Sequence, residues 1–428
     1  MSLGASRRVA LVNLGCRVNR VEIDAMALSL QERGCQIVGE READVIVVNT
    51  CAVTGEAQAK TRKAVRHAAH QPKGPVVVAT GCVASLFSDE LSAISPQVVV
   101  EADKRQVASR VLEALESREA VVADDEQNTV KRTRTTPTGR TRPGIKVQDG
   151  CDNRCTFCIV WKARGHSRSV DERQVLAEVR AAQARGAHEV VLTGINLGNY
   201  RLSDPDGRDR GLPGLLELLL AETDVERIRL SSIEPPDVTE RLLATMADAG
   251  ERVAPFLHVC LQSGCDRTLR EMGRVYDTAA FAQIVAEARQ ALPDLSLGTD
   301  LIVGFPGETD ADFERSLSFC EQMAFSRMHV FRYSRRPGTP AADRPDQTPA
   351  SVAQTRSERM LELAARMRRE QALLRVGKEE LVVVQYPDGR GVTGGLFDAL
   401  VGEGHPLDSL VWATVRGVLP DATLDARG

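Results

Sequence analysis

The chain has 428 residues, of which 43% are hydrophobic and 27% are charged. This composition is typical of soluble globular proteins and excludes a disordered, collagen-like or disulfide-stapled chain. At about 150 residues per domain, the length predicts about three domains. The 55 basic and 59 acidic residues leave a net charge of −4, so evidence for a nucleic-acid partner has to come from local clusters.

Two observations bear on the cellular compartment. No apolar run reaches the ~18 residues that span a bilayer, and the apolar run after the basic start is interrupted at Cys16 and Arg17, too early for a signal peptide. Ten cysteines need an explanation other than disulfides, which are rare in the cytoplasm. We therefore expect a cytoplasmic protein without a membrane partner, and thiolate ligation of a metal or cluster.

Residues 8–117 alternate between short β-branched runs and helical stretches. Such alternation predicts a parallel sheet covered by helices. The expected strands are 9–14, 45–49 and 76–80, and the expected helices are about 20–31, 56–69 and 104–115. We assign residues 6–118 to this N-terminal domain.

The stretch that follows breaks the pattern. Acidic residues up to Glu126 give way to basic residues from Lys131 to Lys146, interleaved with Thr, Pro and Gly. This composition predicts a linker over 119–136. The basic residues either form a solvated connector or contact phosphate.

A second series of strands and helices extends from about residue 145 to residue 333. Repeated βα units over this length predict a partial (β/α) barrel, with reactive groups at the C-terminal ends of the strands. The expected strands are 189–192, 227–232, 256–261, 295–303 and 327–331, and the expected helices are 171–184, 238–248, 278–291 and 310–323. With a charged helix at 352–374, this series forms a core that we assign to 137–368.

After Gly377 the pattern changes to short strands separated by glycine turns. The expected strands are 380–385, 389–395, 399–401 and 411–418, in a small domain over 371–428. The predicted fold class is therefore α/β, with an N-terminal parallel α/β domain, a partial (β/α) barrel and a small C-terminal all-β domain.

The most specific motif is the C-x₃-C-x₂-C loop of Cys151, Cys155 and Cys158. Three thiolates at this spacing can bind three irons of one cubane cluster. Because Fe–S clusters usually have four cysteine ligands, the fourth iron is left open for another ligand. The alternative is a structural zinc site, for which His166 is the nearby candidate for the fourth ligand.

Cys16, Cys51 and Cys82 each come directly after a predicted N-terminal strand. The ends of parallel strands meet at one edge of a sheet, so these thiols are expected to converge although they are far apart in sequence. Gly15 and Gly81 precede two of them and permit tight turns. The alternative is three small buried hydrophobic residues. We favour a second cluster, because burial alone does not concentrate cysteines at strand ends.

The C-x₃-C-x₂-C loop before a series of βα units resembles the radical S-adenosylmethionine (SAM) enzymes. The three-cysteine N-terminal domain and the C-terminal domain, which is similar to the RNA-binding TRAM domain, resemble the methylthiotransferases of that superfamily. Four segments look most like the branch that modifies N6-threonylcarbamoyladenosine at position 37, next to the tRNA anticodon. They are 14–19, 192–198, 227–235 and 329–340.

This resemblance implies two [4Fe–4S] clusters and SAM as cofactors. It implies one cluster on Cys16, Cys51 and Cys82, and the other on Cys151, Cys155 and Cys158. The SAM contacts that it implies are Gly194, Asn196, Ser232, Glu234, Gln262 and Asp300. The implied partners are tRNA, a reducing electron donor of the flavodoxin or ferredoxin type, and a sulfur source. No catalytic acid or base is assigned.

The activity implied by the resemblance is addition of a methylthio group at C2 of that adenosine by radical SAM chemistry. Two alternatives of the same class are methylthiolation of isopentenyladenosine in tRNA and of a ribosomal-protein aspartate. An alternative of another class is a non-catalytic Fe–S electron-transfer or RNA-binding protein.

The sequence also departs from the family pattern. No proline follows the last core cysteine, Arg332 stands in place of another usual proline, and two cysteines flank 261–264 where proline and serine are commoner. Packing or core positions are expected for Cys35, Cys260, Cys265, Cys320 and His258. Phosphate contacts are expected from Arg375, Lys378, Arg390 and Arg416, whereas Arg335 and Arg336 either contact tRNA or lie in a solvated loop.

Overall fold

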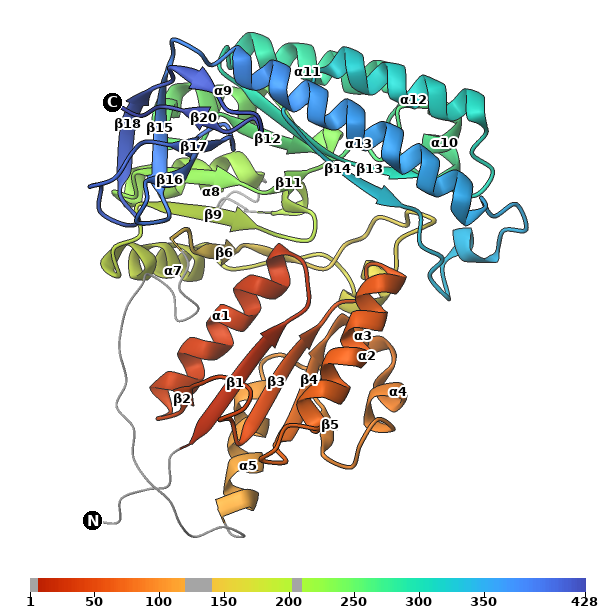
Figure 1. The fold of residues 1–428 in the computed structure, drawn as a ribbon, viewed down its shortest axis with the longest axis vertical. Coiled ribbons are helices and arrows are strands. Elements are labelled where there is room, and N and C mark those ends of the chain that lie inside the picture. Colours follow the sequence, from red (N-terminus) through yellow and green to blue (C-terminus); the bar gives the residue numbers. More distant parts are fainter. Residues whose placement is uncertain (1–6, 120–140, 202–209) are drawn as a thin grey trace. The chain divides into compact units, whose positions relative to one another are not determined.

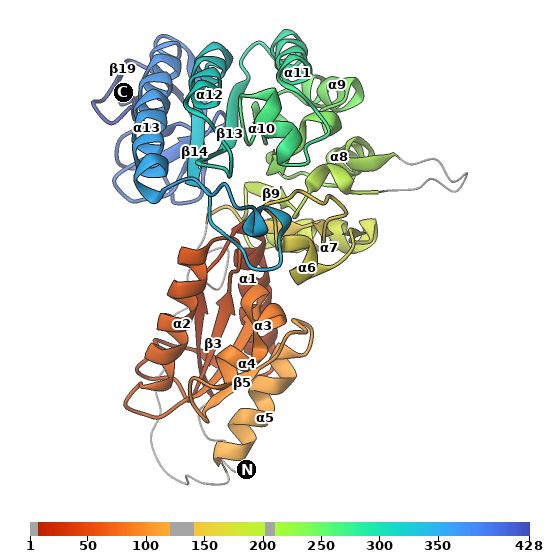
Figure 2. The same cartoon turned by 90° about the vertical axis from the view of Figure 1, so that its right-hand side faces the viewer.

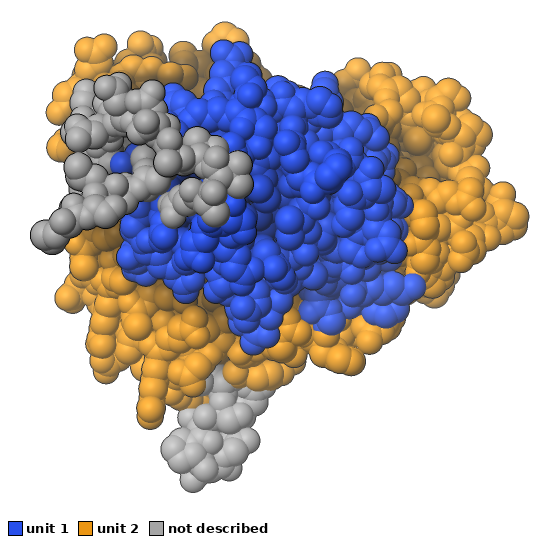
Figure 3. Space-filling model, turned by 90° about the horizontal axis from the view of Figure 1, so that it is seen from below, with its two compact units in different colours: residues 1–140, 158–165 blue, residues 141–157, 166–428 orange. Residues whose placement is uncertain are grey.

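The computed structural model describes residues 7–119, 141–201 and 210–428. The chain forms two compact units, coloured separately in Figure 3. The first comprises residues 1–140 with 158–165, and the second comprises 141–157 with 166–428. The C-terminal all-β domain thus belongs to the same unit as the barrel. Apart from its first residue, the expected linker over 119–136 lies outside the described residues.

The first unit is built around a five-stranded parallel sheet of order β2-β1-β3-β4-β5 (Figure 1). Its strands are β1 (Arg8–Asn13), β2 (Gln36–Ile37), β3 (Val45–Thr50), β4 (Val76–Gly81) and β5 (Val98–Val100). Its helices are α1 (Arg17–Glu32), α2 (Gly55–Ala69), α3 (Cys82–Leu86), α4 (Ser88–Ser92), α5 (Val107–Glu119) and α6 (Val160–Arg164).

Strand β3 is buried along its whole length because helices cover both faces of the sheet. Ile46 and Val48 belong to the apolar cluster that includes α2. Val45 and Val47 belong to the cluster that includes α1 and α5. This is the pattern expected of a parallel strand, which reads as a continuous β-branched run rather than an alternating one.

The second unit contains the expected partial barrel. Its parallel strands form two groups, β10-β9-β6 and β11-β12-β13-β14, and β10 leads directly into β11. The strands are β6 (Gly144–Lys146), β9 (Glu189–Thr193), β10 (Arg227–Leu230), β11 (Ser232–Ile233), β12 (Phe256–Val259), β13 (Ser296–Val303) and β14 (Arg327–Arg332).

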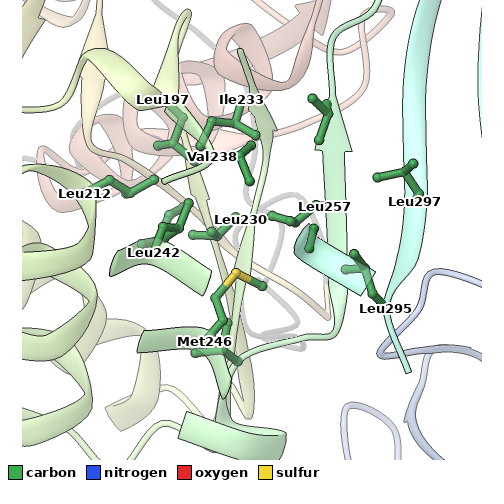
Figure 4. Close-up of a cluster of buried hydrophobic side chains, with 14 of the residues drawn as sticks. Leu197, Leu212, Leu230, Ile233, Val238, Leu242, Met246, Leu257, Leu295 and Leu297 are labelled. Atoms are coloured by element: carbon green, nitrogen blue, oxygen red, sulfur yellow. The ribbon is translucent and has the colours of Figure 1, made fainter. Parts of the chain in front are cut away.

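Helices cover one side of these strands (Figure 2). They are α7 (Glu172–Ala184), α8 (Gly211–Glu222), α9 (Glu240–Ala249), α11 (Thr278–Ala291), α12 (Asp310–Met323) and α13 (Ala350–Leu373). Figure 4 shows part of the apolar core between the two layers, where Leu230 and Leu257 of the strands lie near Leu242 and Met246 of α9. Shorter elements are the antiparallel pair β7 (Gln148–Asp149) and β8 (Arg168–Ser169), helix α10 (Asp266–Glu271), and 3-10 helices at Leu197–Asn199, Pro235–Asp237, Gly250–Arg252 and Pro340–Asp343.

The C-terminal domain is a six-stranded sheet of order β18-β15-β16-β17-β20-β19. Its strands are β15 (Glu379–Val384), β16 (Arg390–Thr393), β17 (Asp398–Leu400), β18 (Leu410–Thr414), β19 (Gly417–Val418) and β20 (Leu424–Asp425). It packs against the barrel strands through Phe256, which forms a buried cluster with Val392 and Leu396.

Two buried arginines of β10 join the barrel to the C-terminal domain. Arg227 donates to the carbonyl of Leu381 at 2.6 Å, and Arg229 donates to the carbonyl of Gly394 at 2.6 Å. Both guanidinium groups also pair with the buried carboxylate of Glu189, at 2.6 and 2.7 Å. Burial alone would raise the pKa of Glu189, but the neighbouring arginines hold it well below its usual value. The joint is therefore a charged cluster sealed from solvent.

The α/β class and the order of the three parts are confirmed, with local differences. The strand expected over 227–232 is interrupted at Ser231, and helix α8 was not anticipated because its leucines face several sides, without a clear apolar stripe. Arg375, from which we expected a phosphate contact, is instead buried. It donates to Ser296 Oγ at 2.7 Å and pairs with Glu380 at 3.3 Å, so it fastens the C-terminal domain to the barrel.

We predict that Glu189→Leu strongly destabilises the second unit. Two buried guanidinium groups would lose their counter-charge, which typically costs about 3–5 kcal/mol of unfolding free energy. Urea denaturation followed by circular dichroism measures this loss. The control is Glu217→Leu, which removes an exposed pair with Arg241 and should cost no more than about 1 kcal/mol. Equal losses in the two variants would contradict the role of the buried cluster.

Candidate cysteine sites at the strand ends

Cys16, Cys51 and Cys82 lie at the carboxyl ends of three neighbouring strands. Cys16 caps α1 after β1, Cys51 follows β3, and Cys82 begins α3 directly after β4. The strands β1, β3 and β4 are adjacent in the sheet, in register at Asn13–Asn49 and at Thr50–Gly81. The structure thus brings together three thiols that are more than 30 residues apart in sequence.

The three thiols are close enough to interact electrostatically. The pKa of Cys51 is raised to about 11, mainly by burial, and the thiols of Cys16 and Cys82 contribute to this rise. All three thiols are free, with Cys16 exposed and the other two buried. Gly81 permits the close approach of two strand ends, since it has a φ of +94° and a Cβ there would lie 2.4 Å from the carbonyl oxygen of Thr50.

A buried polar network lies beside these thiols. Asn19 donates to the carbonyl of Thr50 at 2.9 Å, and Arg164 donates to Asn19 Oδ1 at 2.6 Å. Arg164 also pairs with Glu22 at 2.9 Å, and Glu22 contacts Lys104. Lys104 interacts electrostatically with Cys82. The network therefore places two cations, Arg164 and Lys104, near the thiols.

The second cysteine set occupies one loop between β7 and α6. Burial raises the pKa of Cys151, and the nearby Cys155 thiol adds to this effect. Two intervening residues keep Cys158 within about 11 Å of Cys155. The loop is held at Thr156, whose amide donates to the carbonyl of Met272 and whose carbonyl accepts from the amide of Ala341, both at 2.9 Å.

Arg274 is a functional candidate that sequence reasoning missed. Its guanidinium donates to Cys155 Sγ and to the hydroxyl of Tyr276, both at 3.0 Å, and it pairs with Glu234. Burial raises the pKa of Cys155, and Arg274 opposes that rise. The only local sequence signal is an arginine after the glycine that ends α10, which is too common to indicate a site.

Gly194 and Asn196, both expected to contact SAM, follow β9. A Cβ on Gly194 would lie 2.9 Å from Gln148 Oε1. The same oxygen accepts from the amide of Asn196 at 2.9 Å, and Gln148 Nε2 donates to the carbonyl of Gly150 at 2.7 Å, directly before Cys151. Gln148 therefore connects the glycine turn to the cysteine loop. Asn196 Oδ1 is buried and has no hydrogen-bond partner among the described residues.

The other expected SAM contacts lie on β11–β13. Ser232 is in β11, opposite His258 in register, and Glu234 follows β11 and pairs with Arg274. Gln262 follows β12 with a positive φ of 68°, and its amide donates to the carbonyl of Asp300 at 2.9 Å. Burial alone would raise the pKa of Asp300, but the nearby imidazoles of His258 and His329 hold it below its usual value.

The remaining four cysteines are all buried, and they are Cys35, Cys260, Cys265 and Cys320. Cys265 donates to Asp312 Oδ1 at 3.3 Å, and burial raises the pKa of Cys320 to about 12. Cys260 stands apart from the others because it interacts electrostatically with both Asp300 and Cys155.

The donor chemistry fits iron–sulfur clusters at both sites. Each site offers three cysteines, and thiolates are the usual ligands of such clusters. His166, the candidate fourth ligand for zinc, is largely exposed and bonds to Asp152 at 2.7 Å. The unpartnered oxygen of Asn196 is a ready acceptor for an amino group such as that of SAM.

The family assignment follows from comparison with known proteins. Residues 145–320 match the radical SAM superfamily, and residues 8–101 match uncharacterized protein family UPF0004. A relative from Thermotoga maritima, named threonylcarbamoyladenosine tRNA methylthiotransferase MtaB, is 35% identical over 91% of this chain and 89% of its own. A relative of the same name from Bacillus subtilis is 36% identical over 85% of this chain and 82% of its own.

A third relative has a different printed activity. The tRNA-2-methylthio-N(6)-dimethylallyladenosine synthase of Mycolicibacterium smegmatis is 37% identical over 88% of this chain and 76% of its own. These matches show that the chain belongs to the radical SAM methylthiotransferase family, which confirms the resemblance seen in the sequence. Membership implies a [4Fe–4S] cluster and SAM.

A solved structure with a similar fold is that of TsrM, a radical SAM methyltransferase from Kitasatospora setae. It has a TM-score of 0.57 and 16% identity, and the match covers 83% of this chain and 84% of that one. At this identity the similarity shows the fold alone. Among the described residues, no helix is both long enough and apolar enough to cross a membrane.

We predict that alkylation of the metal-free full-length protein distinguishes the N-terminal thiols. With a pKa of about 11, Cys51 is about one part in a thousand thiolate at pH 8, and its labelling rate should rise about tenfold per pH unit. Exposed Cys16 should react first with iodoacetamide, as peptide mass spectrometry would show. Labelling of Cys51 as fast as Cys16 at pH 8 would contradict the buried arrangement.

Proposed function

We propose that the protein is a tRNA methylthiotransferase that adds a methylthio group to C2 of N6-threonylcarbamoyladenosine at position 37. The observation that carries this proposal is the presence of two three-cysteine sets, one at the strand ends of the N-terminal sheet and one in the loop between β7 and α6. A single cluster with SAM suffices to activate a C–H bond, and a second thiolate site suits a sulfur-transfer step. Four relatives bear the threonylcarbamoyladenosine name, including those from Thermotoga and Bacillus.

We assign one [4Fe–4S] cluster to Cys16, Cys51 and Cys82, and the other to Cys151, Cys155 and Cys158. With SAM, the second cluster supplies the one-electron chemistry that activates an unreactive aromatic C–H bond. The six residues expected to contact SAM remain our proposal for its binding site, and they are Gly194, Asn196, Ser232, Glu234, Gln262 and Asp300.

The protein's own residues hold and orient these groups. Arg274 places a positive charge 3.0 Å from Cys155 Sγ and so stabilises the thiolate. Asn196 Oδ1 can accept a hydrogen bond from a bound amine. Gln148 fixes the glycine turn and the cysteine loop in one arrangement, which reduces the reorganisation needed during the reaction.

The proposed macromolecular partner is tRNA. On the C-terminal domain the side chains of Tyr386 and Trp412 are about half exposed, and the guanidinium of Arg390 lies 4.8 Å from the Tyr386 ring. Arg390 also pairs with Asp388 at 2.7 Å, which holds its guanidinium beside the ring. An exposed aromatic ring beside a cation is typical of surfaces that stack RNA bases. We also propose an electron donor of the flavodoxin or ferredoxin type, a sulfur source, a cytoplasmic location, and the domain limits 6–118, 119–136, 137–368 and 371–428.

The direct test uses the reconstituted protein with SAM, a reductant and tRNA that carries N6-threonylcarbamoyladenosine. Nucleoside mass spectrometry should show the 2-methylthio derivative as product. A parallel reaction with isopentenyladenosine tRNA tests the activity named for the Mycolicibacterium relative. Product from only the isopentenyl substrate would overturn the proposed substrate and leave the family assignment intact.

A second prediction separates the two cysteine sites. Replacing Cys16, Cys51 and Cys82 with alanine should abolish the methylthiolated nucleoside but preserve reductive cleavage of SAM, because the second site is left intact. The matched variant lacks Cys151, Cys155 and Cys158 and should lose SAM cleavage itself. Chromatography of 5′-deoxyadenosine measures cleavage in both. Methylthiolated product from the first variant would show that the N-terminal thiols are structural.

A further inference from the structure

A polar cluster lies on the barrel strands, on the face opposite the helices. His258, Asp300 and His329 come from the adjacent strands β12, β13 and β14, and Asp300 is opposite His329 in register. Side chains alternate between the faces of a strand. Leu257, Leu301 and Met328, at the alternate positions, belong to the core that packs against the helices. The three polar residues therefore share the inner face.

The cluster is organised around one carboxylate oxygen. His329 Nδ1 lies 3.0 Å from Asp300 Oδ1, and His258 Nε2 lies 3.2 Å from the same oxygen. Arg327 Nε donates to His329 Nε2 at 3.4 Å. Because arginine is always a donor, this contact leaves the His329 proton on Nδ1, directed at Asp300. His258 Nε2 is buried but has no hydrogen bond of suitable geometry among the described residues.

The backbone is adapted to hold these rings. A Cβ on Gly298, which is opposite His258 in register, would lie 2.7 Å from the Phe256 ring and 3.0 Å from His258 Nδ1. Only glycine fits at that position without displacing the imidazole. The side-chain exposure rises from 7% at His258 through 26% at Asp300 to 45% at His329. The His258 end of the cluster is therefore buried, and the His329 end is accessible to a ligand.

The surrounding charges favour an anionic ligand. Arg327 interacts with buried Arg229, which belongs to the Glu189 cluster. Among the described residues, no carboxylate lies within ion-pairing distance of the Arg327 guanidinium. Its other charged neighbours are Arg368 and Asp398, which pair with each other at 2.7 Å. An excess of buried positive charge is costly unless an anion compensates it.

The cluster also lies close to the reaction site. Cys260 is on the same face as His258, two residues further along the chain, and it interacts electrostatically with both Asp300 and Cys155. The inner face thus leads from the histidines towards the cysteine loop. A nucleoside whose reacting carbon is near that loop can extend a side arm of several atoms along the inner face.

We propose that Arg327, supported by His329, Asp300 and His258, binds the carboxylate of the threonylcarbamoyl arm and thereby selects this nucleoside over one with an apolar N6 group. This inference rests on the proposed function. The arm carries a carboxylate and a hydroxyl, which suit a guanidinium and an imidazole–carboxylate pair. An isopentenyl arm would leave the same polar groups desolvated and unpaired, which disfavours its binding.

The test compares two anticodon stem-loop RNAs that differ by one charge. One carries N6-threonylcarbamoyladenosine, and the other carries its carboxamide. The holoenzyme should have a lower KM for the acid than for the amide. Arg327→Gln should raise the KM for the acid about 10- to 100-fold, the usual effect of losing a charge-assisted hydrogen bond. The KM for the amide should change little, and Arg327→Lys should recover part of the loss for the acid.

Two controls separate recognition from folding. Arg366→Gln, on an exposed surface of α13, should leave both KM values unchanged. Iron content and substrate-free cleavage of SAM should be the same in the Arg327 and Arg366 variants as in the wild type, because no described contact joins either side chain to the cysteine loop. His329→Asn should reproduce the selective loss for the acid more weakly, since His329 supports Arg327 rather than carrying the charge.

Several results would overturn the inference. If Arg327→Gln raises the KM values for the acid and for the amide by the same factor, Arg327 has a structural role. One equivalent of zinc, retained by the wild type and lost in His258→Ala and His329→Ala, would identify the cluster as a metal site. Wild-type protein that methylthiolates only isopentenyladenosine refutes the proposed function itself. If the wild type methylthiolates the acid and Arg327→Gln has the same KM for it, only this binding site is refuted.

Discussion

The carboxyl ends of parallel strands determine where the reactive side chains of this protein lie. Strands β1, β3 and β4 are adjacent and point the same way, so the residues that follow them meet at one edge. Cys16, Cys51 and Cys82 occupy those positions. In the second unit, the turn with Asn196 and the residues that follow β11 and β12 obey the same rule. Chain topology, rather than sequence proximity, therefore brings together the N-terminal cysteines and the residues that we propose to contact SAM.

A second constraint is the placement of buried charge. Thiolate ligands and anionic substrates are stabilised by nearby cations, yet an unpaired buried cation is destabilising. The structure satisfies both requirements by pairing each guanidinium with a carboxylate beside the site. Arg274 reaches Cys155 while paired with Glu234, and Arg164 reaches Asn19 while paired with Glu22. Arg327 is the exception, because no described carboxylate pairs with its guanidinium, and this is where we place an anionic group.

The sequence was sufficient to predict the parts of the fold with strong local patterns. Valine-rich runs identified β3 and β4, and helices α11 and α12 have the predicted bounds because capping residues and polar turns delimit them. The strand-end cysteines followed from these strands and the rule for parallel sheets. Helix α8 was missed because a leucine-rich segment carries no clear period.

Long-range pairs were beyond sequence reasoning. Arg274 is 119 residues from Cys155, and Arg164 is 142 residues from Glu22. No local pattern marks either arginine. The prediction for Arg375 was wrong. A basic residue beside an expected RNA-binding domain indicated a phosphate contact, whereas Arg375 is buried and bonds to Ser296 and Glu380. His258 was expected to be a core residue, and its link to Asp300 and His329 depends on the register of three strands.

The measurement that tests the central claim most directly is Mössbauer spectroscopy of the full-length protein after anaerobic reconstitution with ⁵⁷Fe. Two clusters of four irons, each with three cysteine ligands, require about eight irons per chain. Addition of SAM should change the spectrum of one site of one cluster and leave the other cluster unchanged. A spectrum that accounts for only four irons, or one in which SAM perturbs neither cluster, would contradict the assignment of two open cysteine sites.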